Sequence, residues 1–407
     1  MRHFLFITSA LLLGSTLPSL GQGEPIAEPL GSSPHIFPEV SRPAQIIPQG
    51  TKTPVHFWAS YLTDYFYNTQ GGLQTGDSFM GLFDFAAEFD LYQILGWEGA
   101  AFVISAIGGH GSDFSARYVG DFGVVSNLYT DTNFNIYHLY FQQSLDGGES
   151  FFRIGQFAID DDFMLSDTAS LFLSSPIGPF NTQSGNMPAP IFPLAAPGLL
   201  LKYSPTDAWY WMTGVYLGNA GAAGPRNRGF EWAWGGPSGW SIFSEVGYSY
   251  DEDGGVLKAG GYWHTGDVTN FANGATENGI GAFYAIVDHP LIGGGENTPS
   301  LHAFARGSIA GKEDRVTVTS QVDGGLVSRN LFLPEDALGV SVSHTAVGDA
   351  FLQANPGSTS GETVVEATYR IQVNEHFAIQ PDVQYIINPQ GSGRDAVAVG
   401  IRGEIGF

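Results

Sequence analysis

Cysteine is absent from the chain, so the sequence offers neither a disulfide framework nor thiolate chemistry. Charged residues are scarce as well: they make up 14% of the 407 residues, against about a quarter in soluble domains. Lys and Arg are the scarcer kind, with 16 residues against 40 Asp and Glu. The formal net charge of −24 argues against nucleic acid as a partner, because its phosphates would be repelled.

Long hydrophobic runs are also missing beyond the N-terminus. Arg2 precedes an apolar run at 4–13, and a break at 14–18 is followed by small residues up to Gly21. This order predicts a signal peptide over residues 1–21. No later segment is an apolar run of about 18 residues, so no transmembrane helix is expected after cleavage. The chain is predicted to be exported, and any membrane span must be made of strands.

Residues 22–54 are rich in Pro, Ser and Gly and show no clear periodicity. They predict an extended N-terminal leader that either enters the lumen of a barrel or lies in the periplasm. Its function cannot be read from the sequence.

What the chain does contain is glycine (55 residues), aromatic side chains (14%) and residue-by-residue alternation. The last eleven residues, 397–407, show the alternation clearly. Every second position, counted from 397, is apolar except Gly403, and the positions between them carry Gly, Ala or a charged residue. The apolar set is Val397, Val399, Ile401, Ile405 and Phe407; the other is Ala398, Gly400, Arg402, Glu404 and Gly406. Since a strand repeats every two residues, one face suits lipid and the other a watery lumen.

The same pattern recurs along residues 55–407. On the strand near 79–90, one face is nearly all Phe and the other carries Asp84, Glu88 and Asp90. Sixteen strands are predicted, and short links alternate with long ones. The first begins at residue 55 and ends before Gly71-Gly72. The others are at about 79–90, 99–109, 135–145, 150–157, 198–204, 208–217, 240–250, 256–265, 279–288, 300–310, 314–329, 338–347, 362–373, 376–387 and 395–407. The predicted fold is therefore all-β: a transmembrane antiparallel up-and-down β-barrel of about 16 strands.

One interruption is too long to be an ordinary link. Residues 158–197 contain three consecutive acidic residues, a short apolar piece and six prolines. Long structureless segments in compact domains are usually functional. We expect this segment to fold inward and narrow the pore.

Several stretches, in their order and spacing, resemble those of the OprB-type carbohydrate-selective porins of bacterial outer membranes. They are Gly71-Gly72; Gly96-Trp97-Glu98-Gly99; Arg153-Ile154-Gly155-Gln156 followed by Asp160-Asp161-Asp162-Phe163; Leu171-Phe172-Leu173-Ser174-Ser175 with Gly178-Pro179; Pro193-Leu194-Ala195-Ala196-Pro197-Gly198; Glu366-Ala367-Thr368-Tyr369; and Gln380-Pro381-Asp382-Val383-Gln384-Tyr385-Ile386-Ile387-Asn388-Pro389. The resemblance covers residues 58–407 and implies a sixteen-stranded barrel that passes sugars by facilitated diffusion. It fails only before the first strand, where the Pro-rich leader replaces a stretch containing Trp and Arg.

Lumen-facing charges are the candidate substrate-binding and constriction residues. The residues selected for this role are Arg153, Asp84, Glu88, Asp161, Asp162, Glu366 and Arg370. Four other lumen-facing charges, Glu245, Arg306, Arg402 and Glu404, belong to the wider set of candidates. Guanidinium and carboxylate groups can hydrogen-bond sugar hydroxyls, but ladders of Arg and Glu can equally hold the wall open and hydrated. The acidic run 160–162 lacks the spaced ligands and Gly of a calcium loop. A solvated acidic turn at the pore mouth that disfavours anions is the preferred interpretation.

Two other classes of protein remain as alternatives. An exported soluble β-sandwich that binds carbohydrate predicts polar outward positions. An outer-membrane esterase would use Ser78 of Gly76-Asp77-Ser78, although no G-x-S-x-G elbow is present. For the porin we predict no enzymatic activity, no cofactor and no metal. The predicted partners are sugars as transported solutes, outer-membrane lipid, and the barrel-insertion machinery through the strand ending at Phe407. The sequence does not determine the oligomeric state.

Overall fold

The computed structural model describes residues 53–131, 133–145, 150–294, 298–390 and 393–406. The predicted signal peptide and nearly all of the leader lie outside these residues. The described chain forms sixteen strands. They are β1 Val55–Gln70, β2 Gly76–Asp90, β3 Ala100–Gly111, β4 Asn135–Leu145, β5 Ser150–Phe157, β6 Ala196–Thr206, β7 Trp209–Leu217, β8 Trp240–Asp251, β9 Gly255–Thr269, β10 Thr276–Ile292, β11 Ser300–Ala310, β12 Val318–Arg329, β13 Ala337–Val347, β14 Gly361–Asn374, β15 Phe377–Ile387 and β16 Ala396–Gly406.

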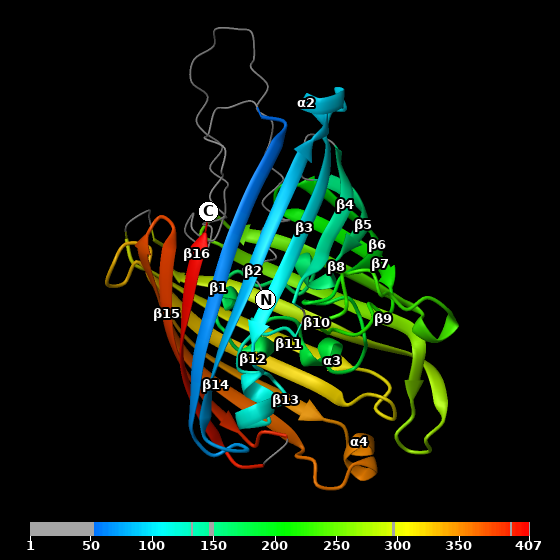
Figure 1. The fold of residues 1–407 in the computed structure, drawn as a ribbon, viewed down its shortest axis with the longest axis vertical. Coiled ribbons are helices and arrows are strands. Elements are labelled where there is room, and N and C mark those ends of the chain that lie inside the picture. Colours follow the sequence, from blue (N-terminus) through cyan, green and yellow to red (C-terminus); the bar gives the residue numbers. More distant parts are fainter. Residues whose placement is uncertain (1–52, 132, 146–149, 295–297, 391–392, 407) are drawn as a thin grey trace.

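Each strand pairs antiparallel with its neighbour in sequence, and β1 pairs with β16 to close the barrel (Figure 1). At this seam Asp64 lies opposite Arg402. The Arg402 guanidinium donates from Nε to Asp64 Oδ1 (2.7 Å) and from Nη2 to Asp64 Oδ2 (2.8 Å). A bidentate pair of this kind has defined geometry, so it helps to hold the first and last strands in register.

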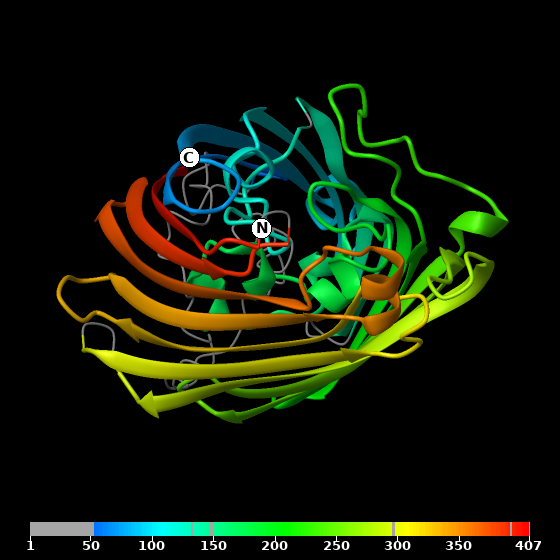
Figure 2. The same ribbon diagram turned by 90° about the horizontal axis from the view of Figure 1, so that it is seen from below.

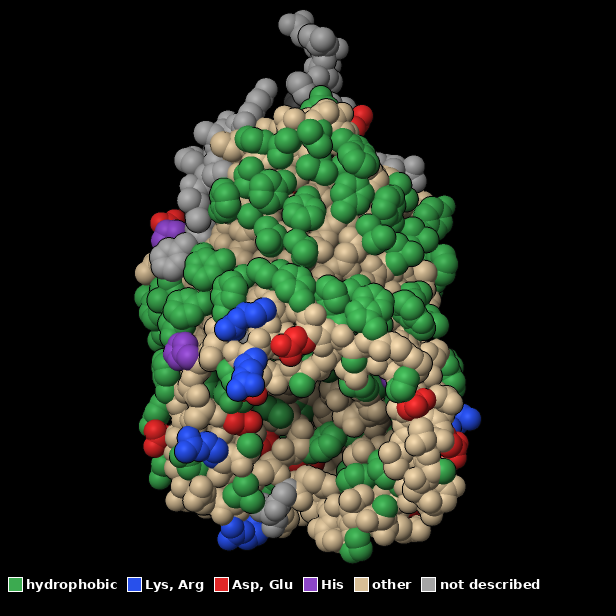
Figure 3. All heavy atoms as spheres, turned by 45° about the vertical axis from the view of Figure 1, so that its right-hand side comes forward, with side chains coloured by type: hydrophobic (Ala, Val, Ile, Leu, Met, Phe, Trp, Pro, Cys, Tyr) green, Lys and Arg blue, Asp and Glu red, His purple; other side chains and the backbone are tan. Residues whose placement is uncertain are grey.

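The two faces of the wall differ as the alternation predicts. Outward residues are apolar and exposed, such as Phe85 (54% exposed) and Val342 (46%). Inward neighbours such as Asp84 and Arg402 are buried. Figure 3 shows hydrophobic side chains covering much of the outer wall, whereas charged side chains gather toward its lower end. A soluble β-sandwich with polar outward positions is therefore excluded by both the closed topology and the apolar outer wall.

The two ends of the barrel differ in the length of their links. The end where β1 begins and β16 ends, here called the terminal end, carries short links such as 207–208 and 375–376. The opposite end, here called the loop end, carries links such as 112–134 and 158–195. This difference is the one predicted from the sequence.

Helical turns occur only in the links of the described chain. They are α2 Leu91–Leu95, η3 Ser115–Val119, η4 Ile159–Asp161, η5 Ala169–Leu171, η6 Ser175–Ile177, α3 Asn181–Ser184, η7 Gly236–Ser238 and α4 Asp349–Ala354. None of the helices in the described residues has the length and apolar character needed to span a membrane. Several predicted boundaries were wrong by three or four residues: β12 begins at Val318 rather than 314, β9 extends to Thr269 rather than 265, β10 spans Thr276–Ile292 rather than 279–288, and β2 begins at Gly76 rather than 79.

Candidate functional site

The segment between β5 and β6, residues 158–195 and here called the inward loop, lies inside the ring of strands (Figure 2). Large apolar side chains hold it there. Phe163 and Phe180 are fully buried. The ring of Phe163 packs on Phe243 of β8 (5.4 Å between centroids), and that of Phe180 packs on Tyr284 of β10 (5.7 Å). Buried aromatic pairs stabilise a contact beyond the area that they cover.

The lumen face under the inward loop is aromatic rather than polar. Tyr216, Phe243, Tyr262 and Tyr284 form one buried cluster with the loop's Phe163 and Phe180. The expectation of a wet lumen along the whole wall is therefore wrong for this part of the barrel. Polar side chains alone could not retain the loop here, because water would compete for their hydrogen bonds.

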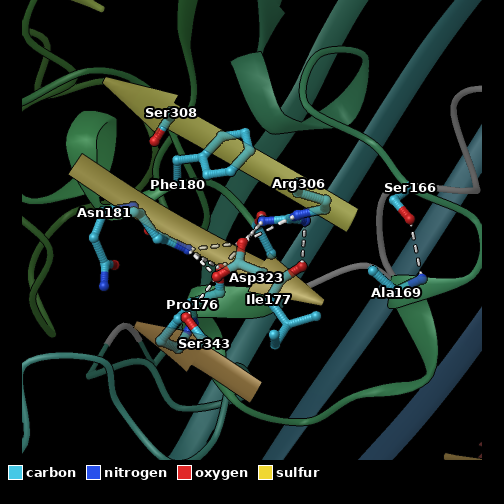
Figure 4. Close-up of polar contacts among 12 residues, drawn as sticks. Ser166, Ala169, Pro176, Ile177, Phe180, Asn181, Arg306, Ser308, Asp323 and Ser343 are labelled. Carbon is cyan, nitrogen blue, oxygen red and sulfur yellow. Dashed lines mark hydrogen bonds and ion pairs between the residues drawn. The ribbon is translucent and has the colours of Figure 1, made fainter. Parts of the chain in front are cut away.

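Arg306 of β11 anchors the middle of the inward loop (Figure 4). Its Nε and Nη2 donate to Asp323 Oδ2 on β12 (3.2 and 3.0 Å). On the loop, Nη1 donates to the Ile177 carbonyl (2.5 Å), and the same Nη2 also donates to the carbonyls of Pro176 (3.2 Å) and Gly178 (2.8 Å). The ring of Phe180 lies 4.5 Å from Arg306 Cζ. The guanidinium is therefore engaged on all sides and fixes the loop to the wall.

Arg153 of β5 holds the start of the loop. Its Nη1 donates to Asp162 Oδ2 (2.7 Å), and its Nε donates to Gln142 Oε1 (3.0 Å). The rings of Tyr140 and Phe157 lie 4.6 and 5.1 Å from its Cζ. Burial raises the pKa of Asp162 to about 6, while Arg153 opposes that shift. The pair is thus shielded from solvent. Its electrostatic attraction is stronger in this buried position than it would be in water.

The acidic run 160–162 is buried at the root of the inward loop, so the predicted solvated turn was wrong. Asp161 Oδ2 is 3.0 Å from His138 Nε2 and accepts the backbone N–H of Ala158 (2.9 Å). Asp160 accepts the backbone N–H of Phe192 (3.3 Å), which joins the two ends of the loop. Burial, and then repulsion from Asp161, raise the pKa of Asp160 to about 8.

The three carboxylates of this run do not converge on one point, because each contacts a different partner. Across the described residues no three His, Cys, Asp or Glu side chains are arranged to hold a metal ion. Asp84 of β2 is close enough to interact electrostatically with Asp161. Four of the predicted residues, Arg153, Asp84, Asp161 and Asp162, are therefore brought to the root of the loop.

The other three predicted residues lie elsewhere on the wall. Glu366 of β14 accepts the backbone N–H groups of Leu173 (2.6 Å) and Ser174 (3.1 Å), so it is a further loop anchor. Arg370, on the same strand, pairs with Glu404 (2.8 Å). Glu88 is partly exposed on β2. Glu366 and Arg370 thus lie on β14, whereas Glu88 shares β2 with Asp84.

Sequence reasoning missed a second segment that packs inward, residues 112–134. Glu362 of β14 accepts the backbone N–H groups of Phe122 and Gly123 (both 2.7 Å). Ser126 Oγ donates to Asp64 Oδ2 (2.6 Å). The sequence did carry a signal, because this link contains more apolar residues than an exposed loop needs. Those that are buried in the structure are Phe114, Val119, Val125 and Leu128.

Two more carboxylates, on β8 and β10, anchor the inward loop; Glu245 was predicted only as a lumen-facing charge, and Asp288 was not singled out. Asp288 of β10 accepts Ser166 Oγ (2.5 Å) and the backbone N–H of Asp167 (3.1 Å). Glu245 of β8 accepts the backbone N–H of Met164 (3.1 Å). Each is an isolated acidic residue in an alternating strand, and nothing in its local sequence distinguishes an anchor from a wall charge.

Ser78, the nucleophile of the esterase alternative, is a buried residue of β2. Its hydroxyl lies 2.9 Å from that of Ser112. No His or carboxylate side chain is hydrogen-bonded to it in the described part of the chain. This environment does not provide the adjacent base that activates a serine nucleophile.

The chain is similar to known outer-membrane channels. The sequence profile described as carbohydrate-selective porin, OprB family, matches residues 75–407. The high-pH structure of Pseudomonas putida OprB superposes with a TM-score of 0.78 at 20% identity, covering 87% of this chain and 94% of that one. The channel DcaP of Acinetobacter baumannii superposes with a TM-score of 0.52 at 10% identity, covering 87% and 97%. No curated protein sequence matches the chain. At such identities the structural likenesses establish the fold.

Proposed function

Because the chain belongs to the carbohydrate-selective porin, OprB family, we propose that it passes neutral mono- or oligosaccharides across the bacterial outer membrane by passive, facilitated diffusion. In this proposal the barrel wall faces lipid, and solute moves through the water-filled lumen that the inward loop leaves open. No cofactor takes part, and no bond of the solute is made or broken.

The observation that carries the proposal is the inward loop inside a closed barrel. Charge-assisted hydrogen bonds fix the loop at three points along its length. Arg153 binds Asp162, Glu366 binds the backbone of Leu173, and Arg306 binds the carbonyl of Ile177. A loop held at several points is a rigid constriction, which can select solutes by size and by the groups that it presents.

We assign the seven predicted residues two different roles. Arg153, Asp161, Asp162 and Glu366 act first by positioning the loop. Arg370, Asp84 and Glu88 remain candidates for contact with solute from the wall. The excess of acidic residues in the chain favours neutral and cationic solutes over anions.

The proposed route to the membrane rests on the two ends of the chain. Residues 1–21 are the export signal, and residues 22–54 are a leader whose role is open. The last strand, with its apolar outward residues Val399 and Ile401, is the segment by which the insertion machinery recognises the barrel. The rest of the outward face is in contact with lipid.

Single-channel conductance of the refolded protein in planar bilayers tests the proposal. Maltose and glucose are titrated at fixed salt, and the fraction of current blocked is followed. Saturable block supports a sugar-selective porin with a binding site in the lumen. Channels that neither sugar blocks indicate a general pore, and well-folded protein that forms no channels refutes transport.

A further inference from the structure

The arginines on the barrel strands fall into two groups. Four are ion-paired to carboxylates: Arg153 with Asp162, Arg306 with Asp323, Arg370 with Glu404 and Arg402 with Asp64. The fifth, Arg329, lies at the end of β12 nearest the terminal end. Within the described residues its guanidinium forms no hydrogen bond or ion pair, and its Nε and Nη2 are shielded without a partner.

Arg329 points to the lumen. Val327 is buried against Ala169 and Leu171 of the inward loop, so its side chain faces the lumen. Because side chains alternate between the two faces of a strand, Arg329, two residues later, lies on the same face as Val327. Its strand neighbours are Ser300 on β11 and Ala337 on β13. Both are small side chains, and neither is hydrogen-bonded to the guanidinium.

Two carboxylates face Arg329 without contacting it. Asp167 of the inward loop and Asp288 of β10 both interact with it electrostatically, but neither forms an ion pair with it. Asp288 is already engaged with Ser166 and with the backbone of Asp167. The Asp167 carboxylate is partly exposed and has no hydrogen-bond partner in the part of the chain that the structure describes.

The chemistry of Arg329 and Asp167 restricts what kind of molecule can bind to both. A guanidinium only donates hydrogen bonds, and a carboxylate only accepts them. An anion is attracted by Arg329 but repelled by Asp167 and Asp288, and a cation is attracted by the carboxylates but repelled by Arg329, so neither charge suits both groups. A hydroxyl group accepts from one side and donates to the other, so a neutral polyhydroxylated molecule satisfies both.

We propose that Arg329 and Asp167 form a binding site for adjacent hydroxyl groups of the transported sugar, between the inward loop and the terminal end of the barrel. The site rests on the proposed function and specifies which residues recognise the solute. It also separates Arg329 from the paired arginines, which position the loop or close the wall. Because Arg329 forms no ion pair within the described residues, none has to be broken when the sugar binds.

The test is glucose block of single channels formed by the wild type, Arg329→Met and Asp167→Asn. A hydrogen bond to a charged group is lost in each variant, so the glucose concentration for half-block is expected to rise about tenfold, which corresponds to about 1.4 kcal/mol. Arg315→Met is the matched control, because Arg315 lies in the link 311–317 at the loop end and pairs with Asp314 and Glu277. It should leave glucose block unchanged.

A second variant, a second blocking solute and a conductance check distinguish failure of the site from other causes. Arg329→Lys keeps the charge but not the planar fork, so partial recovery of block over Arg329→Met supports the site. Gluconate replaces the neutral sugar by an acid, and stronger block by gluconate than by glucose would overturn the assignment to neutral hydroxyls. Ion conductance like that of the wild type shows that each variant is folded. Wild-type block that Arg329→Met leaves unchanged overturns the site alone, whereas a wild-type channel that no sugar blocks overturns the proposed function with it.

Discussion

Replacing Arg306 by methionine should release the middle of the inward loop and widen the pore. The variant removes three hydrogen bonds to the loop carbonyls and leaves Asp323, which is fully buried, without its ion pair. Removing one partner of a buried pair costs about 3–5 kcal/mol. The barrel should stay closed, because strand pairing does not involve the Arg306 side chain. The cost therefore falls on the contact between loop and wall.

The measurement is single-channel conductance in planar bilayers, with refolding checked by the heat-dependent mobility of the barrel in gels. We expect a higher open conductance, more current noise and weaker block by maltose than in the wild type. Arg315→Met serves as the control, since it also removes a paired arginine but one outside the barrel wall. A folded Arg306→Met channel with wild-type conductance and wild-type block would refute the claim that this anchor sets the constriction.

Three further predictions address the seam, the lipid face and the acidic root. Arg402→Met leaves the buried Asp64 uncompensated and should lower the free energy of unfolding by about 3–5 kcal/mol in urea titrations, whereas adding Asp64→Leu should recover most of the loss. Val342→Arg places a charge on the exposed outer wall and should cost about 2–4 kcal/mol in refolding into liposomes; a loss no larger than that of Val342→Ala would contradict a lipid-facing position. The pKa of Asp160 is raised to about 8 by burial, so the folded state holds this proton more tightly than the unfolded state, and stability should fall as pH rises from about 4 to about 8. Asp160→Asn should reduce that fall in melting temperature, and an unchanged pH profile would show that Asp160 does not contribute to it.

The fold could be predicted from the sequence because a strand repeats every two residues and the two sides of a barrel wall contact very different media. Lipid requires apolar side chains, as at Phe85 and Val399, and the lumen tolerates charge, as at Asp84 and Arg402. The two media therefore leave a regular alternation in the sequence. The inward loop was predicted from its length and its prolines, which no ordinary link needs.

The partners of each charge could not be predicted in this way, because they depend on how distant segments meet inside the barrel. Asp64 and Arg402 are 338 residues apart in sequence, and Arg306 is 129 residues from the Ile177 carbonyl that it binds. Alternation places all of these side chains on the lumen face but assigns no contact among them. Closure of the barrel and packing of Phe163 and the rest of the inward loop decided which charges became anchors. The same packing left Arg329, among the strand arginines of the described residues, without an ion pair, although the loop carboxylate Asp167 interacts with it electrostatically.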